Sequence, residues 1–304
     1  MSSSPFVDIW VLNWNGRRYL ETCLPSVLGV NYPSFRVSVL DNGSTDGTQA
    51  WLGRTFPQVQ LVALERNLGY AAANNIGMAR SLADASSYAI LLNNDTRVEP
   101  DWLAALVDAA EGDENVAICQ SRQRSWDGTN EIRFRLVPEW CATETQLSGL
   151  APPGLPAPTP FASGCSMLLR CAALERIGLL DERYFMYFED VDLSLRAWIA
   201  GWRVQDVPAS IVYHWNSGTG TSPLRHVFWA YRNQLTTMLK LYQPQTLRQF
   251  WRPIVRRWFV TRNRYALRGT LSAMAMVAGT MAKRAAVQRG RRLPDAAFLS
   301  LCGS

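Results

Sequence analysis

The sequence is poor in histidine and has no paired cysteine motif, and both features exclude classes of protein. Its 304 residues include two histidines, His214 and His226, and six cysteines, none of which form a C-x-x-C pair. Because structural zinc sites need clustered Cys and His ligands, we do not expect a zinc-binding domain. Scattered cysteines in a chain of this length are typical of a reducing, cytosolic compartment.

Long apolar runs are also missing. The longest uncharged run near the C-terminus, 269–282, has 14 residues, whereas a membrane-spanning helix needs about 20. The N-terminal Met-Ser-Ser-Ser-Pro carries no basic residue, and Asp8 interrupts the short apolar run that follows it. We therefore expect neither a signal peptide nor a membrane span.

Acidic residues are nearly absent from one end of the chain. Residues 224–304 carry 15 Lys and Arg against one acid, Asp295, so this region has a charge of +14. The rest has 16 basic and 24 acidic residues, a charge of −8, which leaves the net charge of +6. An acidic body with a basic tail is typical of a globular domain held near a polyanion. Hydrophobic residues make up 48% of the chain, enough for a full core without disulfides.

Apolar, β-rich runs alternate with helical patterns over the first 120 residues. We expect strands over 7–12, 36–40, 59–64, 87–92 and 115–120. We expect helices over 17–29, 46–55, 69–84 and 99–110. This alternation predicts an α/β fold in which a mostly parallel sheet has helices on both faces.

The second half of the chain is less regular. Residues 121–160 contain six prolines and few apolar periods, which predicts a long, mobile loop. A helix over 190–200 and a strand over 209–213 should follow. The sequence then divides into a domain over 1–223 and a basic, amphipathic helical region over 224–304.

Three of the expected strands end in polar clusters, at residues 13–16, 41–46 and 93–95. Ligands of an open parallel sheet bind beyond the carboxyl ends of its strands, so the clusters should meet at one edge. Together they supply an aromatic ring, amides and carboxylates, which suit a nucleotide bound through a divalent cation. Each cluster taken alone is also a strong turn sequence, which is the structural alternative.

An ordered set of stretches over about 210 residues resembles the family 2 glycosyltransferases of the GT-A fold. They are VLNWNG (11–16), VLDNGSTDGT (39–48), ERNLGYAAANNIG (65–77), LLNNDT (91–96), ASGCSMLLR (162–170), FEDVDLSLR (188–196) and YHWNSGT (213–219). The stretch WAYRNQLTTMLK (229–240) is similar to the rhamnosyltransferase-like branch, which acts on polysaccharide and cell-wall precursors. The resemblance implies a nucleotide-sugar-binding half over about 1–120 and an acceptor half over about 121–223, in which 121–160 governs acceptor choice.

The resemblance also implies a dTDP- or UDP-linked donor, with rhamnose from dTDP-rhamnose preferred, and roles for individual residues. Asp41 would accept a hydrogen bond from the pyrimidine, and Trp14 would stack on the base; an Asx turn and plain packing are the alternatives. The other nucleotide-sugar-binding candidates are Asn13, Asn15, Asn67, Gly69, Asn75, Asn94 and Gly164. Gly164 would let the chain pass close to the donor. The start of the helix at 69–84 can approach phosphate, or it is simply a capped surface helix.

By the same resemblance, Asp95 and His214 would bind Mg²⁺ or Mn²⁺. The acidic motif of the family reads Asn-Asn-Asp here, so only Asp95 contributes charge. A structural hydrogen bond is the alternative for a single histidine.

Glu189 and Asp190 are the candidate catalytic pair. An inverting transfer needs a carboxylate to take the proton of the acceptor hydroxyl. The resemblance assigns this role to Asp190, and Glu189 would orient the acceptor or its loop. The alternative is that Asp190 only caps a helix over 191–200. Asp192 and Arg196 are expected to form a surface ion pair, and the aromatic residues 184–188 to line an acceptor pocket or the core.

Aromatic and basic residues alternate in the tail after Pro253. On one helix from 254, the apolar residues Ile254, Val255, Trp258 and Phe259 fall roughly on one side, and Arg257, Arg264 and Arg268 share another. This pattern is typical of helices that lie in an anionic membrane interface. Each Arg there contributes about 1 kcal/mol. This predicts a cytoplasmic protein bound to the inner face of the cell membrane. The resemblance implies a saccharide acceptor that is often polyprenyl-linked, which suits such a location. Packing on the catalytic domain is the alternative, and nucleic acid is not an expected partner.

Two other functions compete with catalysis of sugar transfer. One is an inactive nucleotide-sugar-binding scaffold, which retention of Asp41, Asp95, Asp190 and His214 argues against. The other is a nucleotidyltransferase, which would need a basic, Gly-rich phosphate loop near the N-terminus. The stretch NWNGRRYL (13–20) has arginines but no such loop.

Overall fold

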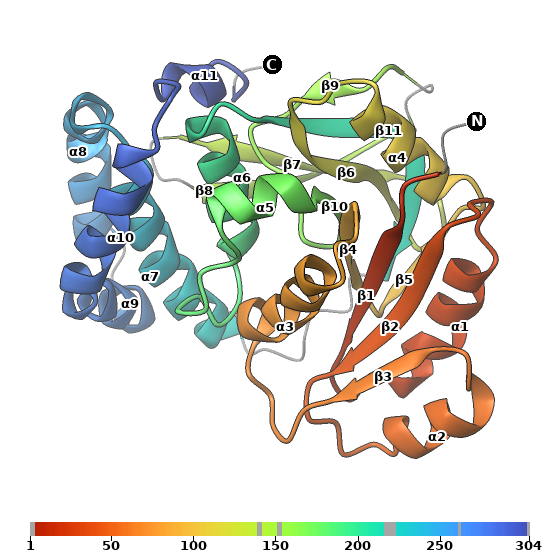
Figure 1. Ribbon diagram of the computed structural model, residues 1–304. Coiled ribbons are helices and arrows are strands. Elements are labelled where there is room, and N and C mark those ends of the chain that lie inside the picture. The colour runs from red at the N-terminus through yellow and green to blue at the C-terminus, as the bar shows by residue number, and fades with distance from the viewer. Residues whose placement is uncertain (1–3, 139–141, 151–153, 216–222, 261–262, 303–304) are drawn as a thin grey trace.

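The computed structural model describes residues 4–138, 142–150, 154–215, 223–260 and 263–302. A central sheet carries helices on both faces (Figure 1). The first strands are β1 (Val7–Asn13), β2 (Phe35–Asp41), β3 (Gln60–Ala63), β4 (Tyr88–Asn93) and β5 (Thr96–Val98). The helices among them are α1 (Arg17–Leu28), α2 (Thr48–Thr55), α3 (Tyr70–Ala83) and α4 (Trp102–Glu111). The strands and helices expected for this part of the chain are confirmed.

The sheet runs in the order β3-β2-β1-β4-β10-β6-β11-β5. Its remaining long strands are β6 (Val116–Ser125), β10 (Ser166–Arg170) and β11 (Arg203–His214). The first four strands are parallel, and β10 is antiparallel to both neighbours. Helices cover both faces, so β1 is buried along its length and reads as a nearly unbroken apolar run.

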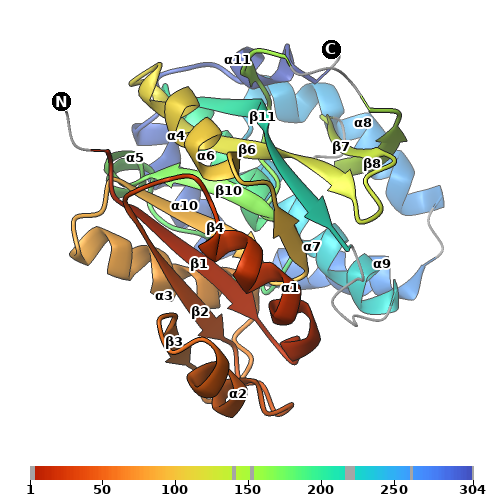
Figure 2. The ribbon, with the colours of Figure 1, turned by 90° about the vertical axis from the view of Figure 1, so that its right-hand side faces the viewer.

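The expected loop over 121–160 is largely a wrong prediction. Strand β6 runs on to Ser125, and β7 (Glu131–Val137) pairs with it and with β8 (Ala142–Ser148). Figure 2 shows β7 and β8 continuing the sheet beyond β6. No proline lies inside β6, β7 or β8, and β9 (Ala157–Pro158) is only an edge pairing. Pro138 directly follows β7, and the prolines of this region drew attention away from the period-two apolar pattern of Ile132, Phe134 and Leu136 within that strand.

Helices make up most of the rest of the described chain. They are α5 (Cys171–Ile177), α6 (Glu189–Ile199), α7 (Pro223–Leu241), α8 (Pro244–Val260), α9 (Arg264–Ala275), α10 (Val277–Arg289) and α11 (Ala296–Leu299). Helix α7 contacts α6, α9 and α10. Helices α8 to α10 lie on the side of the molecule remote from β3 and α2 (Figure 1). Within the described residues, no helix combines the length and apolar character of a membrane span.

The single amphipathic helix expected from 254 to 268 is interrupted. Helix α8 ends at Val260 and α9 begins at Arg264, where Asn263 caps it by accepting a hydrogen bond from the N–H of Tyr265. Arg264 and Arg268 therefore lie on a different helix from the aromatic residues before them. The side chains expected on the apolar face, those of Ile254, Val255, Trp258 and Phe259, lie outside the described residues, as does that of Arg257.

Candidate active site

The polar clusters that end β1, β2 and β4 meet at one edge of the sheet, as expected. Strand β1 lies between the other two, and its register sets Asn13 beside Asp41. Asn13 Nδ2 donates to Asp41 Oδ1 over 3.1 Å. Asn94 Nδ2 donates to Asn13 Oδ1 over 2.6 Å. Asn13 thus joins the three clusters into one hydrogen-bonded edge.

The turns after β1 and β2 hold each other in place. Asn15 has a left-handed φ of 49°, and its Oδ1 accepts from the N–H of Thr45 over 2.8 Å. Asp41 is fully buried, and its Oδ2 accepts from Gln49 Nε2 over 2.8 Å. Trp14 remains 46% exposed beside this edge. Its ring is therefore accessible to a base rather than committed to the core.

Asn67 and Gly69 lie at the start of α3, but protein groups are their nearest neighbours. Asn67 Oδ1 accepts from the N–H of Gly69 over 2.8 Å and from Asn42 Nδ2 over 3.1 Å. Gly69 has a φ of 86°, and a Cβ there would clash with the carbonyl oxygen of Phe185. The approach of the 185 segment is therefore sufficient to explain glycine at this position.

Asn75 has a structural role in place of the expected contact with the donor. It is buried in α3, and its Nδ2 donates to Leu180 O and to Glu182 Oε1, each over 3.0 Å. Its Oδ1 accepts from the N–H of Leu180 over 3.0 Å. Since both amide protons are donated, Asn75 ties α3 to residues 180–182 and has no proton left for a phosphate.

Strands β5 and β11 bring Asp95 and His214 together. His214 Nε2 lies 3.2 Å from Asp95 Oδ1, and both side chains are largely buried. Burial opposes a charge on the imidazole, but Cys165 and Asp95 more than offset it and raise the pKa of His214 well above its ordinary value. The two residues predicted to bind a metal are therefore neighbours at the same edge as the polar clusters.

The Asp95–His214 pair fits a divalent cation of the Mg²⁺ or Mn²⁺ type that displaces the proton of His214, because histidine binds a metal only through a neutral imidazole nitrogen. Such cations are commonly held by one or two protein groups, with waters and substrate phosphates as the other ligands. His214 Nδ1 is buried and has no hydrogen-bond partner among the described residues. No group of three or more metal-ligating side chains occurs within the described ranges. A cation here would thus depend on the donor diphosphate for part of its coordination.

A strained turn precedes the two carboxylates at the start of α6. Tyr187 and Phe188 both have a φ of 70°, a conformation that costs about 1–3 kcal/mol for a residue other than glycine. Asn233 of α7, which is fully buried, donates from Nδ2 to Met186 O over 3.0 Å and to Tyr187 O over 2.8 Å. These two bonds hold the turn in its strained form.

The carboxylate pair itself is buried or nearly so. Asp190 Oδ2 accepts from the N–H of Gly164 over 3.1 Å, and Oδ1 accepts from the N–H of Val191 over 2.8 Å. Glu189 is 5% exposed, and its Oε2 has no hydrogen-bond partner in the described part of the chain. Burial raises the pKa of both carboxyls, and the charge of Asp190 raises that of Glu189 further. Because α6 begins at Glu189, Asp190 lies inside its first turn and is not the N-cap.

Gly164 was expected to pass close to the donor, and in the structure the group that comes close to it is Tyr70. A Cβ at position 164 would lie 2.6 Å from Tyr70 Oη. Tyr70 Oη donates to Gly164 O over 2.5 Å, and the N–H of the same glycine donates to Asp190. Gly164 therefore connects α3 to the carboxylate pair and positions Asp190.

The aromatic residues before α6 pack against α7. Phe185 stacks on Trp229 with ring centroids 5.1 Å apart, and Tyr187 meets His226 edge-on at 4.4 Å. Burial lowers the pKa of His226, which favours the neutral ring. Neither Trp229, His226 nor Asn233 was among the site residues predicted from the sequence. Their spacing could have identified them, since positions 226, 229 and 233 share one face of a helix.

Asp192 and Arg196 are not the surface pair that was expected. Arg196 Nε donates to Asp192 Oδ2 over 2.9 Å, and both side chains are buried. Lys240 of α7 is buried with them and lies 2.6 Å from Asp192 and 2.8 Å from Asp181. The prediction was wrong because the i,i+4 spacing indicates the pair but not its burial, which the distant helix α7 supplies.

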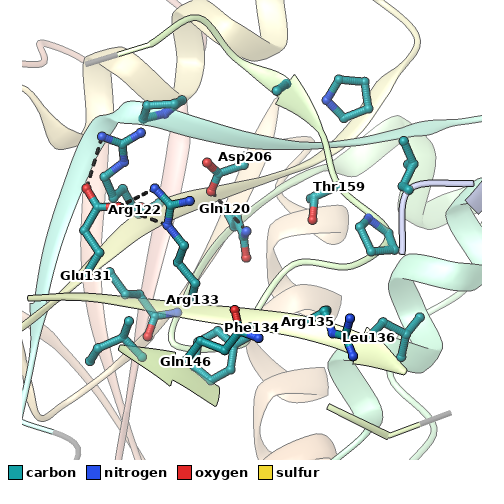
Figure 3. Close-up of a pocket in the computed structure, with 18 of the residues that line it drawn as sticks. Gln120, Arg122, Glu131, Arg133, Phe134, Arg135, Leu136, Gln146, Thr159 and Asp206 are labelled. Carbon is teal, nitrogen blue, oxygen red and sulfur yellow. Dashed lines mark hydrogen bonds and ion pairs between the residues drawn. The ribbon is translucent and has the colours of Figure 1, made fainter. Parts of the chain in front are cut away.

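A cavity of about 510 Å³ lies between β6, β7 and β9 (Figure 3). Arg122 and Arg133 point into it and both pair with the buried Glu131, at 3.3 Å and 2.9 Å. Gln120 on the same wall accepts a hydrogen bond from the N–H of Ser163 over 2.9 Å. The cavity wall is thus bonded to the chain segment that also holds the carboxylate pair.

Known glycosyltransferases share this architecture. GalNAc-T7, solved with UDP, GalNAc and Mn²⁺, matches with a TM-score of 0.66 and 15% identity over 92% of this chain and 58% of that one. The mannosyltransferase PcManGT from Pyrobaculum calidifontis, solved with GDP-Man and Mn²⁺, matches with a TM-score of 0.58 and 18% identity over 99% and 85%. Both are glycosyltransferases of the GT-A fold, and the expected fold class is confirmed.

Sequence comparison agrees with the fold. The model of the family described as "Glycosyl transferase family 2" matches residues 8–178. The N-acetylglucosaminyl-diphospho-decaprenol L-rhamnosyltransferase of Mycobacterium tuberculosis (strain H37Rv) is 31% identical over 236 residues, which cover 69% of this chain and 76% of the relative. The chain is therefore a glycosyltransferase and belongs to glycosyl transferase family 2.

Proposed function

We propose that the chain is an inverting glycosyltransferase that moves L-rhamnose from dTDP-rhamnose to a polyprenyl-linked saccharide in cell-surface polysaccharide synthesis. The observation that carries the proposal is the position of Asp190: a carboxylate with a raised pKa, held by two main-chain N–H groups. The choice of sugar and acceptor rests on the mycobacterial relative, whose name specifies L-rhamnose and a diphospho-decaprenol-linked N-acetylglucosamine.

Asp190 acts as the general base in this proposal. It takes the proton of the acceptor hydroxyl while that oxygen attacks the anomeric carbon of the donor. The bond between this carbon and the diphosphate oxygen breaks in the same step, and the nucleoside diphosphate leaves with the electron pair. A raised pKa makes the carboxylate a better proton acceptor near neutral pH. Glu189 orients the acceptor or its loop, and Gly164 fixes the orientation of the base.

The donor binds at the edge formed by the strand ends. Trp14 offers its exposed ring to the base. Asp41 would accept a hydrogen bond from the pyrimidine and Asn13 would meet the ribose when the edge opens to admit the donor, because both side chains are fully buried in this structure. Asp95 and His214 would hold the divalent cation, which supplies positive charge to the leaving diphosphate. Asn15, Asn67 and Asn94 keep the turns of this edge in place.

The acceptor half extends over about 121–223, and we propose that the cavity beside β6 and β7 contributes to acceptor choice. Arg133 is half-exposed at this cavity and can hydrogen-bond a saccharide or its phosphate. The connection from Gln120 to the main chain at Ser163 links this wall to the base. An Arg133→Ala variant should raise the KM for the acceptor and leave donor hydrolysis unchanged.

We further propose that the enzyme works at the inner face of the cell membrane. A polyprenyl-linked acceptor is confined to a bilayer, and the charge of +14 in residues 224–304 favours an anionic surface.

Donor hydrolysis by the purified chain tests the proposal. The chain is assayed with Mg²⁺ or Mn²⁺ against a panel of dTDP- and UDP-sugars, beside an Asp95→Ala variant. Cation-dependent release of dTDP from dTDP-rhamnose, lost in Asp95→Ala, is the expected result. Release from a UDP-sugar instead would replace the donor but keep the reaction. Binding of nucleotide sugars without any turnover, in hydrolysis or in transfer, would favour the inactive scaffold.

A further inference from the structure

An apolar stripe crosses the outer side of α9 and α10. Five large apolar side chains there are 43% to 61% exposed: Leu267, Leu271, Met274, Val277 and Met281. Within α9, Leu267, Leu271 and Met274 are four and three residues apart, and within α10, Val277 and Met281 are four apart, so each set lies on one side of its own helix. Soluble proteins seldom leave a contiguous apolar surface of this kind in water, so this α9–α10 stripe indicates a binding surface.

The opposite side of α9 packs tightly on α7. Its buried residues are Ala266, Gly269, Thr270 and Ala273. A Cβ at Gly269 would clash with the carbonyl oxygen of Phe228, so the two helices are in backbone contact. The other side of α7 carries Trp229 and Asn233, which contact the segment before the carboxylate pair. The stripe is therefore separated from the candidate active site by one helix, about 10 Å of protein.

Charge distinguishes the possible occupants of the stripe. Residues 263–292 contain seven Lys and Arg and no Asp or Glu, and Arg264 and Arg268 are exposed on α9 beside the stripe. A symmetric contact between the stripes of two copies would bring like charges together, and a nucleic acid would leave the apolar side chains in water. An anionic bilayer accommodates both the apolar side chains and the basic ones. The apolar side chains enter its acyl boundary, and the guanidinium groups meet its phosphates.

We propose that the α9–α10 stripe docks the enzyme on an anionic bilayer and holds the active site beside a lipid-linked acceptor. The biological purpose of this contact rests on the proposed function, whereas the contact itself does not. The surface differs from the one expected from the sequence, which centred on aromatic residues that belong to α8.

Vesicle binding tests this proposal with a matched pair of variants. The wild-type chain, the double variant Leu271→Glu/Met274→Glu, and the control Leu61→Glu are sedimented with vesicles made from equal parts of phosphatidylcholine and phosphatidylglycerol. Leu61 is also an exposed leucine, on β3 at the far end of the molecule. We expect the double variant to lose at least tenfold in vesicle affinity and the control to stay within twofold. Wild-type binding to pure phosphatidylcholine should be at least tenfold weaker.

Donor hydrolysis is measured on the same samples as a test of folding. All three proteins should hydrolyse the donor at equal rates, since the stripe is not part of the active site. Vesicle binding by the double variant at the wild-type affinity would overturn the proposal. A second result would also overturn it: light scattering shows that the wild type is a dimer and the double variant is a monomer. The occupant of the stripe would then be a second copy of the chain. If the wild type hydrolyses the donor but does not bind vesicles, only the docking proposal is contradicted. If it binds vesicles but does not hydrolyse the donor, only the proposed function is contradicted.

A charge variant provides an independent measurement. Arg264→Gln/Arg268→Gln keeps the apolar side chains and should weaken binding to anionic vesicles several-fold, with little effect on neutral ones. Equal weakening on both kinds of vesicle would contradict the assigned role of the arginines.

Discussion

Asn233 on α7 donates a hydrogen bond of 2.8 Å to the carbonyl oxygen of Tyr187, a residue with a φ of 70°. This bond connects the helical C-terminal region to the turn that carries Glu189 and Asp190. Helix α7 thus helps to set the geometry of the candidate catalytic pair, although it lies more than thirty residues away in the sequence.

Replacement of Asn233 by alanine should lower kcat with little change in donor KM. Without the two bonds the strained turn can relax, and the carboxylates move from their productive positions. Small displacements of catalytic groups cost up to about a hundredfold in rate, so we expect a fall of about ten- to a hundredfold. Thr236→Ala, on the same helix and equally buried, is the control. Equal losses in the two variants would reduce Asn233 to a packing residue.

Glu189→Gln should make the protein more stable at neutral pH while it impairs transfer. Burial and the neighbouring Asp190 raise the pKa of Glu189 in the folded state, so the folded chain binds a proton that the unfolded chain has already lost. The free energy of unfolding therefore falls as the pH rises from the ordinary carboxyl pKa through the raised one. Removal of the carboxyl should recover about 1–3 kcal/mol at neutral pH and nothing at pH values below the ordinary pKa.

Urea denaturation at several pH values measures this effect. The raised pKa of Asp190 remains in the variant, so part of the pH dependence should persist. An identical pH dependence in wild type and Glu189→Gln would contradict the assignment of a buried, proton-binding Glu189.

Lys240→Met should destabilise the fold strongly. Lys240 lies between Asp181 and Asp192, and all three are buried. Loss of one partner from a buried ion pair costs up to about 3–5 kcal/mol when the remaining charge has no other partner. Asp192 keeps Arg196 and Asp181 keeps Arg183, so we expect a loss below that limit. Lys283 also pairs with Asp181, at 2.7 Å, but is half-exposed, so Lys283→Met should cost less than about 1 kcal/mol. Similar midpoints for the two variants in chemical denaturation would contradict this difference.

Gly16→Ala should weaken donor binding. A Cβ at position 16 would clash with Asn94 Nδ2 and approach Asn13 Oδ1 to 2.7 Å, which breaks the bond between these two amides. We expect the affinity for dTDP to fall about tenfold, in line with the loss of one well-placed hydrogen bond. Titration calorimetry measures it. Gly53→Ala, in α2 with open space around it, should bind dTDP like the wild type.

Much of the donor edge was predictable because its signals are local. Asn13, Asp41 and Asn94 each follow an apolar run, and parallel strands bring their carboxyl ends together whatever the loops between them do. The pairing of Asp95 with His214 was expected only through the family resemblance. The contact depends on β11 folding back beside β5, which no local pattern in either segment indicates.

The errors concern side chains whose environment is set by distant segments. Asn75 was interpreted as an amide near the start of a helix and free to bind phosphate, but its Nδ2 group donates hydrogen bonds to Leu180 and Glu182. The sequence predicted Asp192 to be a surface residue, but Lys240 of α7 pairs with it in the protein interior. The strand pattern of β7 was obscured by Pro138, which directly follows it, and by the prolines that come after β8 in the sequence. In each case the local sequence identified the residue but did not indicate which distant segment would pack against it.

The most direct test of the proposed mechanism combines product stereochemistry with the Asp190→Asn variant. Transfer from dTDP-rhamnose to a prenyl-diphosphate-linked N-acetylglucosamine is followed, and the anomeric configuration of the product is read by nuclear magnetic resonance. We predict inversion by the wild type, and in Asp190→Asn a transfer rate lower by about 10²–10⁴-fold with unchanged affinity for dTDP. A product of retained configuration, or near-normal transfer by Asp190→Asn, would contradict the assignment of Asp190 as the base of an inverting reaction.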